Sequence, residues 1–483
     1  MPTENATGTS RLSFWPRVRE FAVPASLIET ATARRNAGDW AGACAAAGFD
    51  LDLSPRTVAR THGHELAALL RADLRHLAPD LLRWHMPRVA PDGLLRPGLT
   101  VSLAVYDTAG RDGVPPVHLV ARTAPAWADA GQRISLALWD GSRSGAAARR
   151  HPHPHPDRRF RLDLHRHLWD ARRAGELRVR SGAGLPPGPD PDERWAVGRW
   201  AAEARLLLRA EGGGSDTVAV RLGTRDRLLL EPGPDGDGRH ADGPDGDGRH
   251  ADGPHGDGAA GPPAVRAEAV SAQACDPALP VLPDAATWLL PDLRLLRAGA
   301  IEADALHPLV AAALVPGHAP APPSRGTGPD PGPGPDPAGR PRLVDCRGEL
   351  HRIALVDGVL APLDHDPEEL RREELLVALT GTPLPCLQAI DVAHRRPDCI
   401  TAVRERLRHG DVRGALAVVE GLLGPDAVLR DGVLRDELEA AARQRITHGL
   451  FRAGLTGPAP AWFLPDERRA PHRRRRSRHA ADR

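Results

Sequence analysis

Residues 98–106 read Gly98-Leu-Thr-Val-Ser-Leu-Ala-Val-Tyr106, with apolar side chains at every second position from Val101 to Val105. This period of two is that of a β-strand with one buried face. The pattern returns in short runs separated by turn signals, at 117–119, 134–138, 160–164, 218–222 and 228–230. Several such runs predict a β-rich middle of the chain, folded as a sandwich or barrel, with helices at 164–174 and 193–208 and a last strand at 264–269.

Before residue 98 the apolar residues recur at the spacing of an α-helix. Ser54-Pro55 is a helix start signal, and the leucines from Leu66 to Leu77 that follow recur at helical spacing. Pro24 opens an earlier predicted helix that ends near Gly38, and Asp39 is the expected N-cap of the next one. We therefore predict a helical N-terminal part.

After residue 342 the sequence predicts one hairpin and then mainly helices. Residues 342–344 and 352–356 flank a turn at Gly348. Asp366-Pro367-Glu368-Glu369 is a capping arrangement that starts a helix running to Gly381. Three more helices are expected near 398–409, 411–423 and 432–453.

Two long stretches lack large apolar side chains. Residues 232–263 contain the ten-residue unit Pro-Asp-Gly-Asp-Gly-Arg-His-Ala-Asp-Gly twice in tandem, at 234–243 and 244–253. Residues 316–342 are rich in Pro and Gly. Such compositions bury too little surface to offset the entropy of ordering, so we predict disorder in both.

These patterns predict a multi-domain α+β protein with long disordered linkers. The expected parts are a helical region (12–95), a β-rich domain (96–231), a disordered repeat linker (232–263), a continuation of the β domain with helices (264–315), a disordered Pro/Gly linker (316–342), a mainly helical C-terminal domain (343–457) and a basic tail (465–483).

Composition excludes several kinds of chemistry. All 64 basic residues among the 483 are Arg, so Schiff-base chemistry and the phosphate-binding lysine of a Walker loop are excluded. Five scattered Cys do not suggest a disulfide framework, and no apolar run approaches a membrane span. We expect a cytoplasmic protein with no membrane contact.

One constellation could carry chemistry. Cys346, His351, Asp364 and His365 lie on and after the predicted hairpin, and Asp366 is already expected to be an N-cap. A thiolate, imidazoles and a carboxylate could form a Cys–His nucleophile pair or a zinc site. Their spacing fits no known pattern, so we assign no catalytic residue, metal or cofactor.

The last residues form an Arg-rich tail that includes Arg473, Arg474, Arg475 and Arg476. Such a tail could make weak, non-specific contacts with anions or nucleic acid.

Two short segments of the chain match each other: Gly38-Asp-Trp-Ala-Gly-Ala43 corresponds to Gly410-Asp-Val-Arg-Gly-Ala415. Both are expected to be turns of helical hairpins.

Four blocks, at 24–48, 90–102, 126–141 and 363–376, resemble an uncharacterised protein family of high-GC Gram-positive bacteria. That resemblance implies no activity and no site. Because strong catalytic motifs are absent, the sequence favours a non-enzymatic role, as a protein–protein interaction adaptor or accessory subunit with an unknown partner. The alternatives are a hydrolase or metal-dependent enzyme that uses the Cys346/His351/His365 region, and a nucleic-acid-associated protein that uses the tail.

Overall fold

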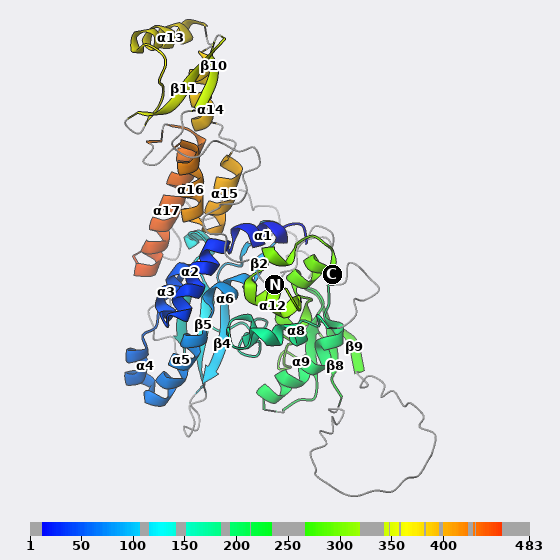
Figure 1. The fold of residues 1–483 in the computed structure, drawn as a ribbon. Helices are drawn as coiled ribbons and strands as arrows, with labels where there is room; N and C mark the ends of the chain where they lie inside the picture. The colour runs from blue at the N-terminus through cyan, green and yellow to red at the C-terminus, as the bar shows by residue number, and fades with distance from the viewer. Residues whose placement is uncertain are drawn as a thin grey trace, which may run out of the picture.

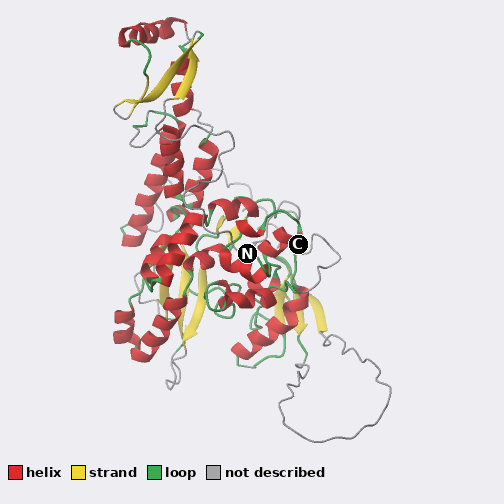
Figure 2. Ribbon diagram, viewed as in Figure 1, coloured by secondary structure: helices red, strands yellow, loops and turns green. Residues whose placement is uncertain are grey.

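The computed structural model describes residues 12–106, 115–141, 151–184, 194–212, 214–233, 266–318, 342–346, 348–356, 359–380, 383–395, 399–423, 428–429 and 431–455. They form helices and several small sheets, so the protein is α+β, as the change of hydrophobic period predicts. Figures 1 and 2 show this arrangement. Nearly all of the two predicted linkers, and the tail with its Arg473–Arg476 run, lie outside the described residues.

Helices fill most of residues 15–85: α1 (Trp15–Phe21), α2 (Ala25–Asn36), α3 (Trp40–Ala46), α4 (Pro55–His62), α5 (His64–His76) and α6 (Pro79–His85). Pro24 precedes α2, and Asp39 caps α3 by accepting a hydrogen bond from the Gly42 amide at 2.8 Å, both as predicted. The helix expected from Ser54 onward is instead two helices. Gly63 separates them with a φ of +94°, a value that ends a helix.

The main sheet contains the predicted strands and one further strand. Its order is β1 (Phe49–Leu51), β6 (Ile134–Trp139), β5 (Val117–Thr123) and β4 (Thr100–Tyr106). β1 pairs with β6 in parallel, and the other neighbours are antiparallel. The expected helical region therefore contributes the edge strand β1, which is too short to show an alternating pattern. A small hairpin of β2 (Arg88–Val89) and β3 (Leu94–Leu95) follows α6.

One hydrophobic core, which we call the body core, joins distant parts of the chain. It extends from Phe14 to Leu314 at the end of α12 (Pro308–Leu314) and includes one face of the main sheet. Trp15, Trp84 and Trp169 are among its fully buried side chains. Because apolar burial contributes about 25 cal/mol per Å², this core is the main source of stability in the molecule.

A smaller sheet has its own cluster. Its order is β7 (Val218–Arg221), β8 (Asp226–Glu231) and β9 (Arg266–Ser271), and α9 (Val197–Ala210) packs against it through Trp200 and Leu207. β9 pairs with β8 from the far side of the repeat segment, which confirms the strand predicted near 264–269.

The prediction for residues 160–179 is wrong in its secondary structure. Phe160 and Leu162 are fully buried, but the stretch makes a single bridge to the sheet instead of a strand. The helix expected at 164–174 is replaced by the 3₁₀ turns η3 (Arg166–Leu168) and η4 (Ala174–Glu176), and α8 (Leu177–Arg180) follows. The reason is tertiary hydrogen bonding, because the Trp169 carbonyl accepts from the Ala78 amide and the Trp169 indole donates to the Leu162 carbonyl.

The other short elements of the body are η2 (Ala126–Ala128), α10 (Asp284–Thr287), α11 (Pro291–Arg297) and η5 (Ala303–Ala305).

The C-terminal part extends away from the body (Figure 1). Its elements are β10 (Arg342–Cys346), β11 (Glu349–Val356), β12 (Val359–Pro362), α13 (Pro367–Thr380), α14 (Pro385–Arg395), α15 (Ile400–His409), α16 (Val412–Leu423) and α17 (Val433–Ala453). The hairpin, α13 and the three last helices confirm the predictions, whereas β12 and α14 were not predicted. Residues 342–395 form a distal unit that we call the C-terminal module. Among the described helices, none combines the length and hydropathy that a membrane crossing requires.

Candidate metal centre

The inner face of the three-stranded sheet in the C-terminal module carries two possible ligands. In the antiparallel pairing of β10 with β11, Val344 lies opposite His351 and Cys346 lies opposite Glu349. Opposite residues share a face of a sheet, so Cys346 and His351 lie on the same side. That side is the buried one, because Cys346 is only 2% exposed.

The other two ligands come from the segments that follow the sheet. His365 lies between β12 and α13, next to Asp366, whose carboxylate accepts a hydrogen bond from the Glu368 amide as the predicted N-cap does. Cys386 is the second residue of α14, and Pro385 occupies its first position. α14 packs on the inner face of the sheet, and this places the Cys386 thiol against that of Cys346.

Cys346, His351, His365 and Cys386 therefore form one cluster, in which each residue offers one ligand atom and all these atoms lie within 4.8 Å of one another. The two imidazoles point a nitrogen at each other, with 2.6 Å between His351 Nδ1 and His365 Nε2. Both cysteines are free thiols.

The outward nitrogens of the two histidines face carboxylates. His351 Nε2 is 3.6 Å from Glu349 Oε2, and His365 Nδ1 is 3.6 Å from Glu369 Oε2. In metal sites a carboxylate beside the far nitrogen of a ligating imidazole fixes the ring orientation and makes the ring a better donor. Both histidines thus have the surroundings of ligands that direct their inner nitrogens to a common point.

The Cys386 thiol is protonated in the absence of a cation. Burial and the neighbouring Cys346 raise the pKa of the Cys386 thiol to about 12. A divalent metal would displace that proton, because the thiolate is the form that binds metal.

Two thiolates and two imidazoles are a donor set of structural zinc sites. With Zn–S near 2.3 Å and Zn–N near 2.0 Å, tetrahedral geometry places neighbouring donors roughly 3.3–3.8 Å apart, a spacing that small side-chain movements reach from the present cluster. Four protein ligands would fill the coordination sphere and leave no position for a water molecule or a substrate. The arrangement therefore suits a metal that holds the fold together.

Of the four residues that the sequence singled out, the structure brings together Cys346, His351 and His365, but not Asp364. The Asp364 carboxylate binds Arg352, accepting from its backbone amide at 2.7 Å and from Nη2 at 2.6 Å. These bonds hold the pKa of Asp364 at about 2. Asp364 thus braces β11 against the segment after β12.

Cys386 was missed because its helix was missed. The run Gly381-Thr-Pro-Leu-Pro-Cys386 contains two prolines and a glycine, residues that usually end a helix, and no helix was predicted between Gly381 and residue 398. Proline is also favoured at the first position of a helix, and Pro385 occupies that position in α14. Pro385 followed by the apolar residues Leu387 and Ile390 was the signal that could have revealed it.

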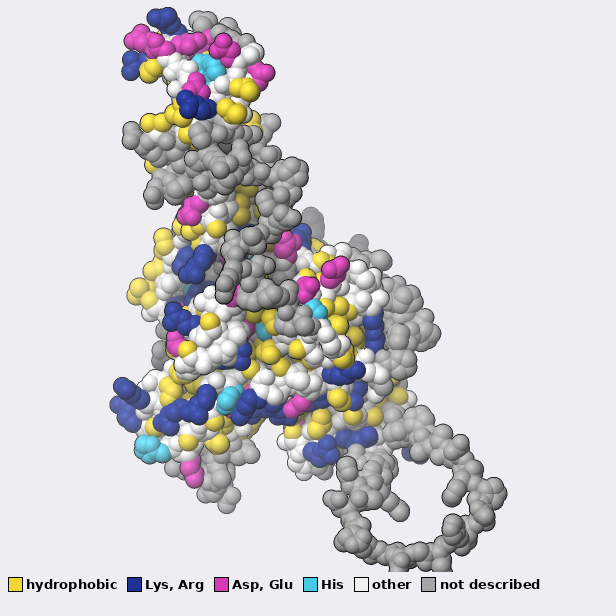
Figure 3. Space-filling view, in the orientation of Figure 1, with side chains coloured by type: hydrophobic (Ala, Val, Ile, Leu, Met, Phe, Trp, Pro, Cys, Tyr) yellow, Lys and Arg dark blue, Asp and Glu magenta, His cyan; other side chains and the backbone are white. Residues whose placement is uncertain are grey.

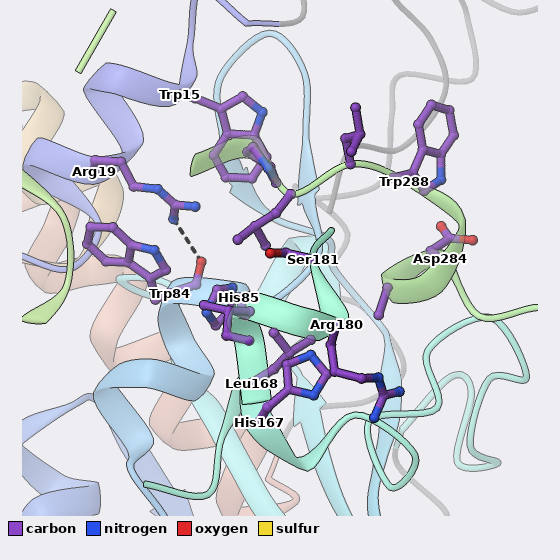
Figure 4. Close-up of a pocket in the computed structure, with 15 residues that line it drawn as sticks. Trp15, Arg19, Trp84, His85, His167, Leu168, Arg180, Ser181, Asp284 and Trp288 are labelled. Atoms are coloured by element: carbon purple, nitrogen blue, oxygen red, sulfur yellow. Dashed lines mark hydrogen bonds between the residues drawn. The ribbon is translucent and has the colours of Figure 1, made fainter. Parts of the chain in front are cut away.

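A cavity in the body has a different character (Figure 4). Its walls are largely aromatic and aliphatic, with Trp15, Trp84 and Trp288 among them. Its charged groups already have partners, in the ion pairs Arg19–Asp292, Arg180–Glu203 and Arg159–Asp284. His85 and His167 line it too, and burial lowers the pKa of each imidazole well below the usual value. The charged side chains of this cavity are thus already paired and stabilise the fold, and its imidazoles are neutral.

No family model matches the chain, and neither a curated protein nor a solved structure matches it.

Proposed function

We propose that the protein is a protein–protein interaction adaptor whose C-terminal module is closed by a zinc ion. The observation that carries the proposal is the cluster of Cys346, His351, His365 and Cys386, with all four donor atoms within 4.8 Å of one another. A donor set supplied entirely by the protein favours a structural ion over a catalytic one.

The small size of the module supports a role for metal in its stability. Its hydrophobic cluster has few fully buried members: Cys346, Ile353, Leu384, Cys386 and Ile390. Units with so small a core usually depend on a metal or a disulfide. Because the two cysteines belong to both the core and the donor set, zinc would fasten α14 to the sheet at its centre.

The outer face of the same sheet supports an interaction role. Leu343, Leu350 and Val356 are 57%, 67% and 46% exposed. The strand register places these side chains opposite to the Cys346 face. Acidic side chains gather over α13 beside this sheet (Figure 3). An apolar strip next to an acidic helix suits a protein partner that offers apolar and basic side chains.

The zinc part of the proposal is tested by metal analysis of protein purified under reducing conditions without chelator. We expect one zinc ion per chain, and Co²⁺ substitution should give the absorption of a tetrahedral site with two thiolates. Cys386→Ser should lose the metal. Cys399→Ser and Asp364→Asn are the matched controls, because both residues lie near the cluster but outside it, and they should keep the metal.

Zinc content that is unchanged in Cys386→Ser would contradict this ligand assignment, as would wild-type protein that fails to bind added zinc. Azide that alters the Co²⁺ spectrum would reveal an open coordination position, and would favour the metal-dependent enzyme instead.

The interaction part is tested on the outer face. Leu350→Asp should abolish co-purification of a partner from the native cell while leaving the zinc content intact. Leu69→Asp is the control, because Leu69 is exposed to a similar degree, 55%, on α5 of the body. A partner retained by Leu350→Asp would exclude this face.

A further inference from the structure

A second cavity lies on the main sheet, far along the chain from the metal centre. The cross-strand register aligns Asp50 of β1, Ser135 of β6 and Arg122 of β5 in one row. Ile134 and Leu136, on either side of Ser135, belong to the body core, so this row occupies the opposite, polar face. Residues of α17 also line the cavity, which is partly open to solvent.

The acidic groups of this cavity are already engaged. Asp50 binds Arg133, with 3.0 Å between Oδ2 and Nε, and lies 3.2 Å from His448 Nε2. Burial pushes the pKa of Asp50 upward, but the hydrogen bonds from His448 and Arg133 outweigh it and hold that pKa well below its usual value. Asp52 binds Nη1 of Arg452 at 2.6 Å. Both carboxylates are thus occupied by other cations.

Among the described residues, no carboxylate pairs with Arg122 at ion-pair distance, and Asp52 attracts it only from further away. Its side chain lines the cavity, and the residue is only 4% exposed. Within the residues that the structure describes, its hydrogen bonding is confined to a long contact of 3.5 Å from Nη2 to the Pro154 carbonyl, and Nε has no acceptor. Within the described part of the chain, no carboxylate lies within 4.0 Å of this guanidinium.

A buried guanidinium without a close counter-charge is costly, because the attraction of Asp52, which lies beyond ion-pair distance, replaces only part of the hydration that burial removes. Burial lowers the pKa of Arg122, and the Asp52 carboxylate raises it in part, but a guanidinium stays protonated at neutral pH in any case. An anion from outside the fold would supply both the acceptors and the close negative charge that this guanidinium lacks. Its planar fork of N–H groups matches the oxygens of a carboxylate or a phosphate.

We propose that this cavity binds the carboxylate or phosphate group of a small molecule, with Arg122 as its principal anchor. The Ser135 hydroxyl lies beside Arg122 in the same row and is a second donor. His448, Phe451 and Arg452 of α17 close the other side, so that the bound anion lies between the sheet and α17. The site is independent of the zinc proposal, since none of its lining residues belongs to the C-terminal module.

The test is isothermal titration of the full-length protein with inorganic phosphate and, separately, with acetate, at constant ionic strength set by NaCl. We expect saturable binding of at least one of them to one site per chain, weakened at least tenfold in Arg122→Gln. Phosphate alone would identify a phosphorylated ligand, and acetate alone a carboxylic acid. Arg56→Gln is the matched control, because Arg56 is exposed on α4 and its loss should leave binding unchanged.

Arg122→Gln also removes the unpaired charge, so in the absence of added anion its melting temperature should be no lower than that of the wild type. This measurement shows that any loss of binding is not caused by loss of folding. Arg452→Gln on α17 gives a second test and should weaken binding several-fold. Absence of saturation with both anions would overturn the proposal, as would equal affinity in wild type and Arg122→Gln.

Discussion

Two turns in this molecule have nearly the same sequence and the same local geometry. Gly38 between α2 and α3 has a φ of +78°, and Gly410 between α15 and α16 has a φ of +88°. In each turn the next residue is an aspartate that caps the following helix, with 2.8 Å from its Oδ1 to the amide of Gly42 or Gly414. Each aspartate also pairs with the arginine five positions before it, at 2.9 Å for Arg34–Asp39 and 2.7 Å for Arg406–Asp411.

The surroundings of the two turns are opposite. A Cβ added at Gly38 would meet no atom within 4 Å. A Cβ added at Gly410 would lie 1.9 Å from the carbonyl oxygen of Gly131, in the loop before β6. Arg83 of α6 strengthens that contact by donating to the carbonyls of His409 and Gln132 at 2.8 Å and 2.6 Å. Nearby residues thus specify the turn, whereas its docking depends on residues that are distant along the chain, such as Arg83, which is 326 positions from His409.

Replacing each glycine by alanine should separate these two contributions most strongly. Gly38→Ala introduces only left-handed strain, which costs about 1–2 kcal/mol. Gly410→Ala adds the overlap with Gly131, for about 1–3 kcal/mol more, because backbone rather than a flexible side chain must move. Denaturant unfolding measures the two costs, and hydrogen exchange should show α15 and α16 loosened in Gly410→Ala alone. An equal loss of unfolding free energy in the two variants would mean that the loop containing Gly131 can move aside at little energetic cost.

The same distinction explains how much could be predicted from the sequence. Asp39, Gly410 and the Asp366-Pro367 start signal act within a few residues, and the structure confirms the helices they predict. Phe49–Leu51 and Cys386 depend on distant partners: the first is a strand because β6 lies beside it, and the second reaches the cluster because α14 packs on the sheet. Sequence patterns therefore identified Cys346, His351 and His365 as candidate ligands, but they could not identify Cys386.

Acid should also distinguish the two turns. His409 is buried beside Gly410, whereas the corresponding residue of the first turn is Ala37, which does not titrate. Burial is the main cause that lowers the pKa of His409 to about 3, and Arg88 and Arg83 add repulsion. Arg408 and Arg17 act in the same direction, and Glu405 Oε2 lies 3.8 Å from Nε2.

Because the folded state resists protonation, the stabilisation from neutral His409 is complete above the unfolded pKa of about 6.5 and is lost as the pH falls toward 3. Between pH 7 and pH 5 we expect a loss of about 2 kcal/mol from this residue. The control is His409→Leu, which should remove that part of the pH dependence in urea titrations. Carboxylates such as Glu203, with a pKa of about 2, contribute only below about pH 4.5. The same slope in wild type and His409→Leu would refute the assignment.

The smallest expected effect concerns the caps, where the two turns are most alike. Asp39→Ala and Asp411→Ala each remove one side-chain acceptor from a helix N-terminus, at a cost of about 1 kcal/mol. Asp→Asn keeps an acceptor and removes the charge, so it isolates the arginine pair. At position 39 that pair is exposed and worth little. At position 411 it is more buried, and Arg406 Nε already lacks an acceptor, so Asp411→Asn should cost more than Asp39→Asn. Denaturant unfolding of the four variants at low and high salt measures this difference. If Asp39→Asn lowered the unfolding free energy more than Asp411→Asn, burial of the arginine–aspartate pair would not explain the difference between the two turns.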